Sequence, residues 1–247
     1  MCPRMSSMAL LRGEKNDTFE YSGVLAVPLT FSHDGGIISN AINLEITGDG
    51  SSSTWEEVEW SGLKERIGKS GWSTRMKTVY SDSGIYFLFS CEDKLITATF
   101  DKDNEKLWTE DVVEVFLWTD EQYPVYFEYE LSPLNFELPL LISRMNGTHK
   151  NWGWIPWQYQ ERKIQHLTST QGGKKESGSK ISSWTAEIFI PFDLLTHFSN
   201  TPPKSGTKWR ANMYRVDYDK GAIKEWSWSV FKTNFHDYEN FGTLSFE

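Results

Sequence analysis

Apolar and polar side chains alternate along most of the chain, and this period of two predicts strands rather than helices. The clearest case is residues 74–91, where two alternating runs flank the turn sequence SDSG and so predict a hairpin. In all, at least nine strands are expected at short spacing, which is typical of an all-β sandwich or open barrel. Beyond the hairpin, the expected strands are residues 111–118, 125–131, 138–145, 157–166, 184–190, 208–218, 225–230 and 242–246.

One short helix is the exception to this pattern. A proline opens a turn with an apolar side at residues 191–197, which predicts one or two helical turns there. The Gly- and Ser-rich residues 48–54 and 172–183 predict loops, the second of them mobile. Neither loop separates segments of contrasting composition. We therefore expect a disordered leader over residues 1–20 and a single β-sandwich domain over residues 21–247.

The alternation also separates an inner face of each strand from an outer face. In the strand 111–118, Val113, Val115 and Leu117 form the core side, and Glu114 lies on the other side beside aromatic rings. If this strand pairs with the next one, several carboxylates gather among rings on one outer face. An ordinary solvated face with cross-strand ion pairs is the alternative. The other strands would add Glu128, Glu130, Arg210, Asn212 and Tyr214 to the same face.

This set of groups suits a sugar. Hydroxyls both donate and accept hydrogen bonds, so they pair with carboxylate, amide and guanidinium groups, and pyranose rings stack on aromatic side chains. Aromatic residues make up 15% of the chain and include 12 tryptophans, whereas the mean hydropathy is only -0.50. Most of these rings are expected to pack a core, and some could form a stacking surface.

Charge and composition exclude several other classes of protein. With 25 Lys and Arg against 34 Asp and Glu, the net charge is -9, which argues against binding to nucleic acid or to an anionic membrane. Cys2 and Cys91 provide neither a disulfide framework nor a thiolate zinc site. The apolar runs are shorter than the ~20 residues of a membrane span. Without a targeting signal in the chain as given, we expect a cytoplasmic protein, or a secreted or extracytoplasmic one if a leader has been removed.

Five pieces of sequence, in order, resemble the family-nine carbohydrate-binding modules and their stand-alone relatives. They are WTEDVVEVF with YFEYELSP, WTAEIFIPFDLL, KWRANMYRVD, EWSWS and FHDYENFGTLSF, and the resemblance covers residues 55–246. It implies a two-sheet antiparallel β-sandwich, jelly-roll-like, that holds a sugar between two aromatic rings without catalysing a reaction. In the best-known members the ring pair grips the reducing end. The corresponding positions here are Trp108 and Phe235, a Phe where the xylanase-borne module has Trp.

The resemblance implies polar contacts as well. Glu114 corresponds to the strand glutamate that bonds sugar hydroxyls, and Asp111 matches the acidic residue at the start of that strand. Asn234 approximates the amide that precedes the second ring. His236 resembles the histidine of the stand-alone group, with a purely structural hydrogen bond as the alternative.

One departure from the family pattern concerns the strand after Glu114. Where the sugar-binding modules carry an arginine, this chain has Glu128 and Glu130. Arg210 and Arg215 are the candidates to replace the missing cation. An acidic cleft would favour cationic or amino sugars electrostatically, and the sequence leaves this question open.

No cofactor is required by this interpretation, although family members can carry structural calcium. Asp101, Asp103 and Asn104 supply oxygen ligands of the kind that calcium prefers, and a polar turn is the alternative.

Two other functions stay open. A glycoside-cleaving enzyme would use Glu114 with Glu128 or Glu130 as its carboxyl pair. A haem-binding sandwich would ligate iron through Met213 and a lysine or histidine. The sequence names neither the sugar nor the partners, so the protein could act alone or beside a separately encoded glycoside hydrolase.

Overall fold

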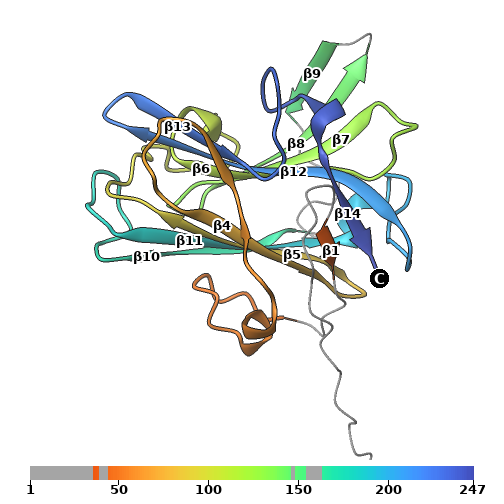
Figure 1. Cartoon of the computed structure of the whole chain (residues 1–247), viewed down its shortest axis with the longest axis horizontal. Coiled ribbons are helices and arrows are strands. Elements are labelled where there is room, and N and C mark those ends of the chain that lie inside the picture. Colours follow the sequence, from red (N-terminus) through yellow and green to blue (C-terminus); the bar gives the residue numbers. More distant parts are fainter. Residues whose placement is uncertain (1–35, 39–43, 146–147, 154–162) are drawn as a thin grey trace, which may run out of the picture.

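The computed structural model describes residues 36–38, 44–145, 148–153 and 163–247, which form two sheets packed face to face (Figure 1). The expected leader over residues 1–20 lies outside the described residues. The first sheet runs β1 (Gly36–Ile38), β14 (Gly242–Phe246), β12 (Lys208–Asp219), β6 (Val112–Trp118), β7 (Val125–Leu131), β8 (Glu137–Met145) and β9 (Thr148–Gly153), with β13 (Ala222–Ser227) beside β12 and β3 (Lys64–Ile67) beside β13. The second sheet runs β10 (Gln165–Gln171), β11 (Ser183–Pro191), β5 (Gly84–Glu92), β4 (Thr74–Tyr80) and β2 (Ser61–Gly62).

The predicted all-β two-sheet sandwich is therefore confirmed. The hairpin of β4 and β5 has the expected register, from Thr74 opposite Cys91 to Tyr80 opposite Ile85. Among the described strands all pairs are antiparallel except β1 with β14. Of the expected strand 157–166, residues 157–162 lie outside the described part, and β10 starts at Gln165 and continues to Gln171.

Two local predictions needed correction. The expected helix at residues 191–197 is a single 3-10 turn, η4 (Phe192–Leu195), because so short a segment cannot nucleate an α-helix. β13 ends at Ser227 rather than at residue 230. The side-chain amide of Asn212 accepts from the Ser229 N–H at 2.8 Å and donates to the Ser229 carbonyl at 2.9 Å, which takes up the backbone groups that a longer strand would pair.

The loop at residues 172–183 is bonded to the neighbouring segment 93–96. The Ile96 N–H donates to the Ser179 carbonyl at 3.0 Å, and the Gly178 N–H donates to the Ile96 carbonyl at 2.8 Å. These backbone bonds connect the β10–β11 loop to the segment that leads from β5 toward β6.

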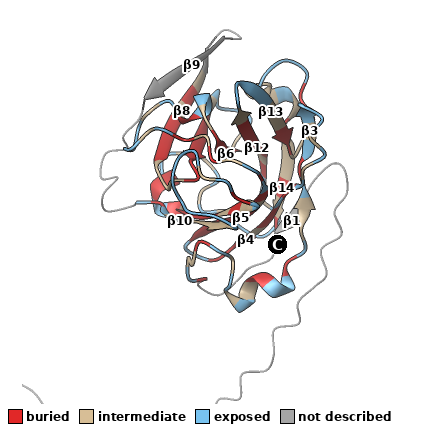
Figure 2. Ribbon diagram, turned by 90° about the vertical axis from the view of Figure 1, so that its left-hand side faces the viewer, coloured by how far each residue is buried: buried red, intermediate tan, exposed pale blue. Residues whose placement is uncertain are grey.

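The main core lies between the sheets, as the buried inner strand faces in Figure 2 show. Val113, Val115 and Leu117 are fully buried there, as the alternation of their strand predicts. Trp184, Trp209 and Trp226 are buried in the same core, so many of the rings serve packing.

The outer face of the second sheet is covered by η1 (Ser53–Glu57), which lies below that sheet in Figure 1. Trp55 is buried against β4 and β5, and its indole N–H donates to Oε1 of Glu187 at 2.7 Å. The backbone N–H groups of Thr47 and Gly48 donate to Oε2 of the same carboxylate. One buried glutamate thus anchors the whole segment to the sheet.

Candidate functional site

The outer face of the first sheet is also covered, which corrects the alternative of an ordinary solvated face. Two segments pack on it: residues 100–109 with η2 (Leu107–Thr109), and residues 228–241 with η5 (Tyr238–Asn240). A second apolar cluster forms beneath them. Its members include Phe116, Tyr126, Tyr214, Phe231 and Phe241.

A cavity of about 310 Å³ opens between these covering segments and the strands. It brings together predicted site residues from four separate parts of the chain, so the sequence-based hypothesis of a common site is supported for this subset. The predicted residues that line it are Trp108, Glu114, Glu128, Asn234, Phe235 and His236.

The two aromatic rings are held differently. Trp108 lies on η2 with 38% of its surface exposed, and its carbonyl accepts a hydrogen bond from the Tyr218 hydroxyl at 3.0 Å. Phe235 stacks on the buried ring of Tyr214, with centroids 4.1 Å apart and planes within 6°. The Tyr214 hydroxyl also donates to the Phe235 carbonyl at 2.7 Å. Tyr214 therefore supports the second ring from below rather than lining the cavity.

Three carboxyl groups lie together on the covered face. The register of β6 and β7 places Glu114 opposite Glu130, and Glu128 follows on the same face of β7. All three are at most 4% exposed. Among them Glu114 Oε1, Glu128 Oε2 and both carboxyl oxygens of Glu130 have no hydrogen-bond partner.

Burial raises the pKa of all three carboxyls, because it disfavours the charged form. It raises the pKa of Glu128 to about 8. The pKa of Glu114 is raised well above its ordinary value by burial and then by the charges of Glu128 and Glu225. The pKa of Glu130 is raised likewise, first by burial and then by Glu114 and Glu128. At neutral pH the cluster therefore retains protons.

His236 and Arg66 complete the polar lining. Nδ1 of His236 is 2.6 Å from the Tyr126 hydroxyl and 3.8 Å from Glu128 Oε2. The His236 ring also stacks on Phe116, so this residue has a structural role as well as a place in the cavity wall. Arg66 donates to Glu225 at 2.8 Å, and its guanidinium lies 4.3 Å from the centroid of the Phe231 ring.

Arg66 and Glu225 line the cavity although the sequence-based prediction missed both. Glu225 could have been found, because the alternation in EWSWS places it opposite the core residue Trp226. Arg66 could not, since β3 has only four residues, too few to show an alternation. The guanidinium in the cavity therefore comes from Arg66, not from Arg210 or Arg215.

The remaining predicted ligand residues have structural roles instead. Asp111 is buried and accepts from the backbone N–H groups of Thr97 at 2.6 Å and Tyr218 at 2.9 Å. Arg210 donates to the Phe241 carbonyl at 3.0 Å and pairs with Glu121, away from the cavity. Asn212 bonds to the backbone of residues 213 and 229, and Glu130, which lies opposite Glu114 in the sheet, does not line the cavity. Alternation placed Arg210, Asn212 and Glu130 on the covered face but could not give their partners, and Asp111 was assigned through the family resemblance.

The predicted calcium ligands lie in a polar turn. Oδ1 of Asp103 accepts from the Glu137 N–H at 3.0 Å, and the Asn104 N–H donates to the Glu137 carbonyl at 2.8 Å. Asp101 precedes this turn and is exposed. These bonds support the polar-turn interpretation over a calcium loop.

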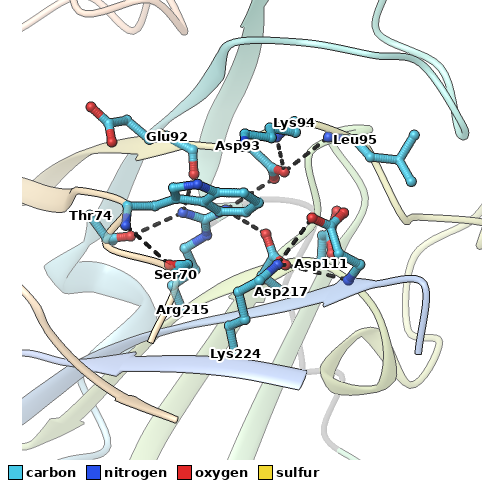
Figure 3. A network of polar contacts seen from close by, with 12 residues as sticks. Ser70, Thr74, Glu92, Asp93, Lys94, Leu95, Asp111, Arg215, Asp217 and Lys224 are labelled. Atoms are coloured by element: carbon cyan, nitrogen blue, oxygen red, sulfur yellow. Dashed lines mark hydrogen bonds and ion pairs between the residues drawn. The ribbon is translucent and has the colours of Figure 1, made fainter. Parts of the chain in front are cut away.

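Within the described residues, a different acidic group has the spacing that could hold a metal ion: Asp93, Asp217 and Asp219. Two internal cations already bind these carboxylates (Figure 3). Arg215 contacts Asp93 at 3.0 Å and Asp217 at 2.8 Å, and Lys224 contacts Asp217 at 2.6 Å and Asp219 at 3.0 Å. The three carboxylates are thus already paired with two cations of the protein itself, which fits a metal poorly.

The haem alternative loses its candidate ligand. Met213 is fully buried in the core between the sheets and does not line the cavity described above. Among the described residues, no helix has the length and apolar character that crossing a bilayer would require.

The β-sandwich fold, with a cavity of aromatic rings and carboxyl groups on an outer face, is typical of sandwich-type binding modules. The chain belongs to carbohydrate-binding family 9, whose family model matches residues 56–246. No match was found among curated proteins.

Solved structures of family members and relatives share the fold. A protein from Bacteroides uniformis, provisionally described as carbohydrate-binding, is 16% identical with a TM-score of 0.68, over 87% of this chain and 99% of its own. A family 9 module from Caldicellulosiruptor kristjanssonii in complex with cellotriose is 16% identical with a TM-score of 0.60, over 85% of this chain and 92% of its own. Its complex with glucose gives the same identity and TM-score over 86% and 95%.

Proposed function

We propose that this protein binds a mono- or oligosaccharide in the cavity between Trp108 and Phe235 and has no catalytic activity of its own. The observation that carries the proposal is the convergence of these two rings with Glu114 and Glu128 in one cavity of a family 9 chain. The solved module from C. kristjanssonii was in complex with cellotriose and with glucose, so gluco-configured sugars are the first ligands to test.

Each part of the cavity has a role in this proposal. The exposed Trp108 ring supplies a flat apolar surface for the C–H face of a pyranose, and Phe235 is held in place by Tyr214 to meet the other face. Protonated carboxyls both donate and accept hydrogen bonds, as sugar hydroxyls do, so Glu114 and Glu128 fix the orientation of the ring.

The protonation of the carboxyls favours binding over turnover. Glycoside cleavage by a carboxyl pair needs one protonated group and one ionised group that acts as nucleophile or base. Burial raises the pKa of Glu114, Glu128 and Glu130 together and so disfavours the ionised partner. The same residues that an enzyme would use are therefore better suited to hydrogen bonding.

The proposal is tested by isothermal titration calorimetry with glucose, cellobiose and cellotriose, and with their reduced alditols. Trp108→Ala should weaken binding about tenfold or more, equivalent to ~1.4 kcal/mol of lost stacking. Tyr123→Ala is the matched control, because Tyr123 is an aromatic residue with 56% exposure that does not line this cavity. Equal affinity of Trp108→Ala and the wild type would contradict the aromatic site, and loss of binding to alditols would place the reducing end in it.

A further inference from the structure

Two glutamates in the wall of the cavity each have a buried carboxyl oxygen without a hydrogen-bond partner. Glu114 and Glu128 line the cavity, and each is buried with one carboxyl oxygen that has no partner. Glu225 adds a third carboxylate to the lining. A carboxylate only accepts, so this wall is complementary to a ligand that donates.

Three donors that lie near this wall already have partners within the protein. The Tyr214 hydroxyl donates to the Phe235 carbonyl, and Nη1 of Arg66 donates to Glu225. The Tyr126 hydroxyl is paired with Nδ1 of His236. None of these bonds reaches the unpartnered oxygens of Glu114 and Glu128.

We propose that the cavity selects a sugar that carries a protonated amine, and that the ammonium group binds between Glu114 and Glu128. This inference rests on the proposed function, because it names the class of sugar for the same site. An ammonium has three donors and no acceptor, so it matches two carboxylates better than a hydroxyl does. Buried hydrogen bonds between charged groups are also the stronger ones.

The charged groups around Glu114 and Glu128 favour a cationic ligand. Glu130 faces the pair from β7, and Tyr214 and Glu225 face it from β12 and β13. Arg66 on β3 is engaged by Glu225 and stacked on Phe231, and His236 lies 3.8 Å from Glu128. The lining therefore carries three glutamates against one arginine and one histidine, and an added positive charge favours the ionised form of these carboxyls.

Binding of an ammonium group would change the protonation of Glu114 and Glu128. Because the carboxyls retain protons at neutral pH in the empty cavity, an ammonium can form ion pairs only if they ionise. At least one glutamic acid then loses its proton to the solvent while the amine keeps its own. Binding of an amino sugar should therefore release protons, whereas binding of a neutral sugar should release none.

The test compares glucosamine, glucose and N-acetylglucosamine by calorimetry at pH 7, with each titration repeated in phosphate and in HEPES buffer, neither of which carries a primary amine. Glucosamine should bind about tenfold or more tightly than the other two, and its heat should depend on the buffer because protons are released. Glu114→Gln should reduce the ratio of the affinity for glucosamine to that for glucose, and it should reduce the proton release. Glu121→Gln, whose side chain is 61% exposed and outside the cavity, is the matched control.

Equal affinity for glucose and glucosamine, with no proton release from the wild type, would overturn the inference and leave the proposed function standing. Absence of binding by every sugar, with Trp108→Ala indistinguishable from the wild type, would overturn both. The two-buffer comparison uses only the wild type, so it decides the question even if Glu114→Gln does not fold.

Discussion

Arg215 is a fully buried cation on the inner face of β12. Its guanidinium contacts the carboxylates of Asp93 and Asp217, and its central carbon lies 4.5 Å from the centroid of the Trp226 ring. Burial raises the pKa of Asp93 to about 6 in spite of the attraction to Arg215. The network is therefore one in which desolvation and ion pairing nearly balance, and each partner depends on the others.

We predict that Arg215→Met lowers the free energy of unfolding by about 3–5 kcal/mol, because it leaves Asp93 buried without a counter-charge. Urea unfolding at pH 7 measures this. Lys174→Met removes one member of an ion pair that is 81% and 62% exposed, and it should cost less than about 1 kcal/mol. The double variant Arg215→Met with Asp93→Asn should recover part of the loss. A single variant as stable as the wild type would refute the interpretation.

Residue by residue, the sequence predicted the site in part. Strict alternation identified Glu114 and Glu128, because strand geometry fixes the face of each side chain. Alternation could not separate a ligand-facing residue such as Glu114 from one that bonds to backbone, such as Asn212, and Asp111 was predicted from the family resemblance alone. That distinction depends on which distant segment covers the strand, and residues 228–241 leave no periodic pattern that would show it.

Gly84 begins β5 at the turn of the β4–β5 hairpin, and its importance comes from packing rather than from turn conformation. A Cβ atom there would lie 2.4 Å from the Phe189 ring and 2.5 Å from the Ile190 carbonyl oxygen. No side chain can be added without moving β11, which pairs with β5 at this point.

We expect Gly84→Ala to destabilise the protein by about 1–3 kcal/mol, the usual cost of overpacking a buried site. Gly62→Ala is the matched control, because a Cβ at Gly62 meets nothing within 4 Å, and it should change stability by less than about 0.5 kcal/mol. Thermal unfolding followed by circular dichroism distinguishes the two. Equal melting temperatures for both variants would contradict the close approach of β11.

The segment that carries η1 depends on Glu187 in a similar way. Glu187 is completely buried in β11, and its carboxylate accepts from Trp55, Thr47 and Gly48. Glu187→Gln replaces one acceptor oxygen by a donor, so at least one buried N–H loses its partner. The expected cost is about 1–3 kcal/mol.

Hydrogen exchange locates this effect. Amides of residues 44–58 should exchange faster in Glu187→Gln, and those of β6 and β7 should not change apart from the global loss of stability. Uniform acceleration across the chain would argue against a local anchor.

At the scale of secondary-structure elements, the sequence pattern predicted the long strands and missed the shortest ones. β4, β6, β7 and β14 are within one residue of their expected bounds, because each has several alternating positions. β2 and β3 have too few residues to show a period. The C-terminal end of β13 differs from its expected position because the Asn212 side chain from β12 bonds to the backbone of Ser229.

Across the whole molecule, the buried carboxyls make the folded state bind more protons than the unfolded chain. Glu128 has a pKa of about 8 when folded against an ordinary value of 4.5, and Asp93 about 6 against 3.8. The associated stability is fully present below the unfolded pKa values and is lost as the pH rises through the folded ones.

The free energy of unfolding should therefore fall between about pH 5 and pH 8, by up to ~1.4 kcal/mol per pH unit for each additional proton bound. Urea titrations at several pH values measure the slope. Glu128→Gln should flatten it, since glutamine does not titrate, and Glu121→Gln should leave it unchanged. Stability that rises over this pH range would contradict the protonated cluster.

β1 and β14 run parallel at one edge of the first sheet, with Gly36 opposite Leu244 and Ile38 opposite Phe246. A pulling force that enters the chain through β1 and leaves it through β14 would act along both strands in opposite directions. Their hydrogen bonds would then be loaded together in shear rather than opened one at a time. Under tension between its two ends, the sandwich should resist extension at this strand pair before either sheet separates.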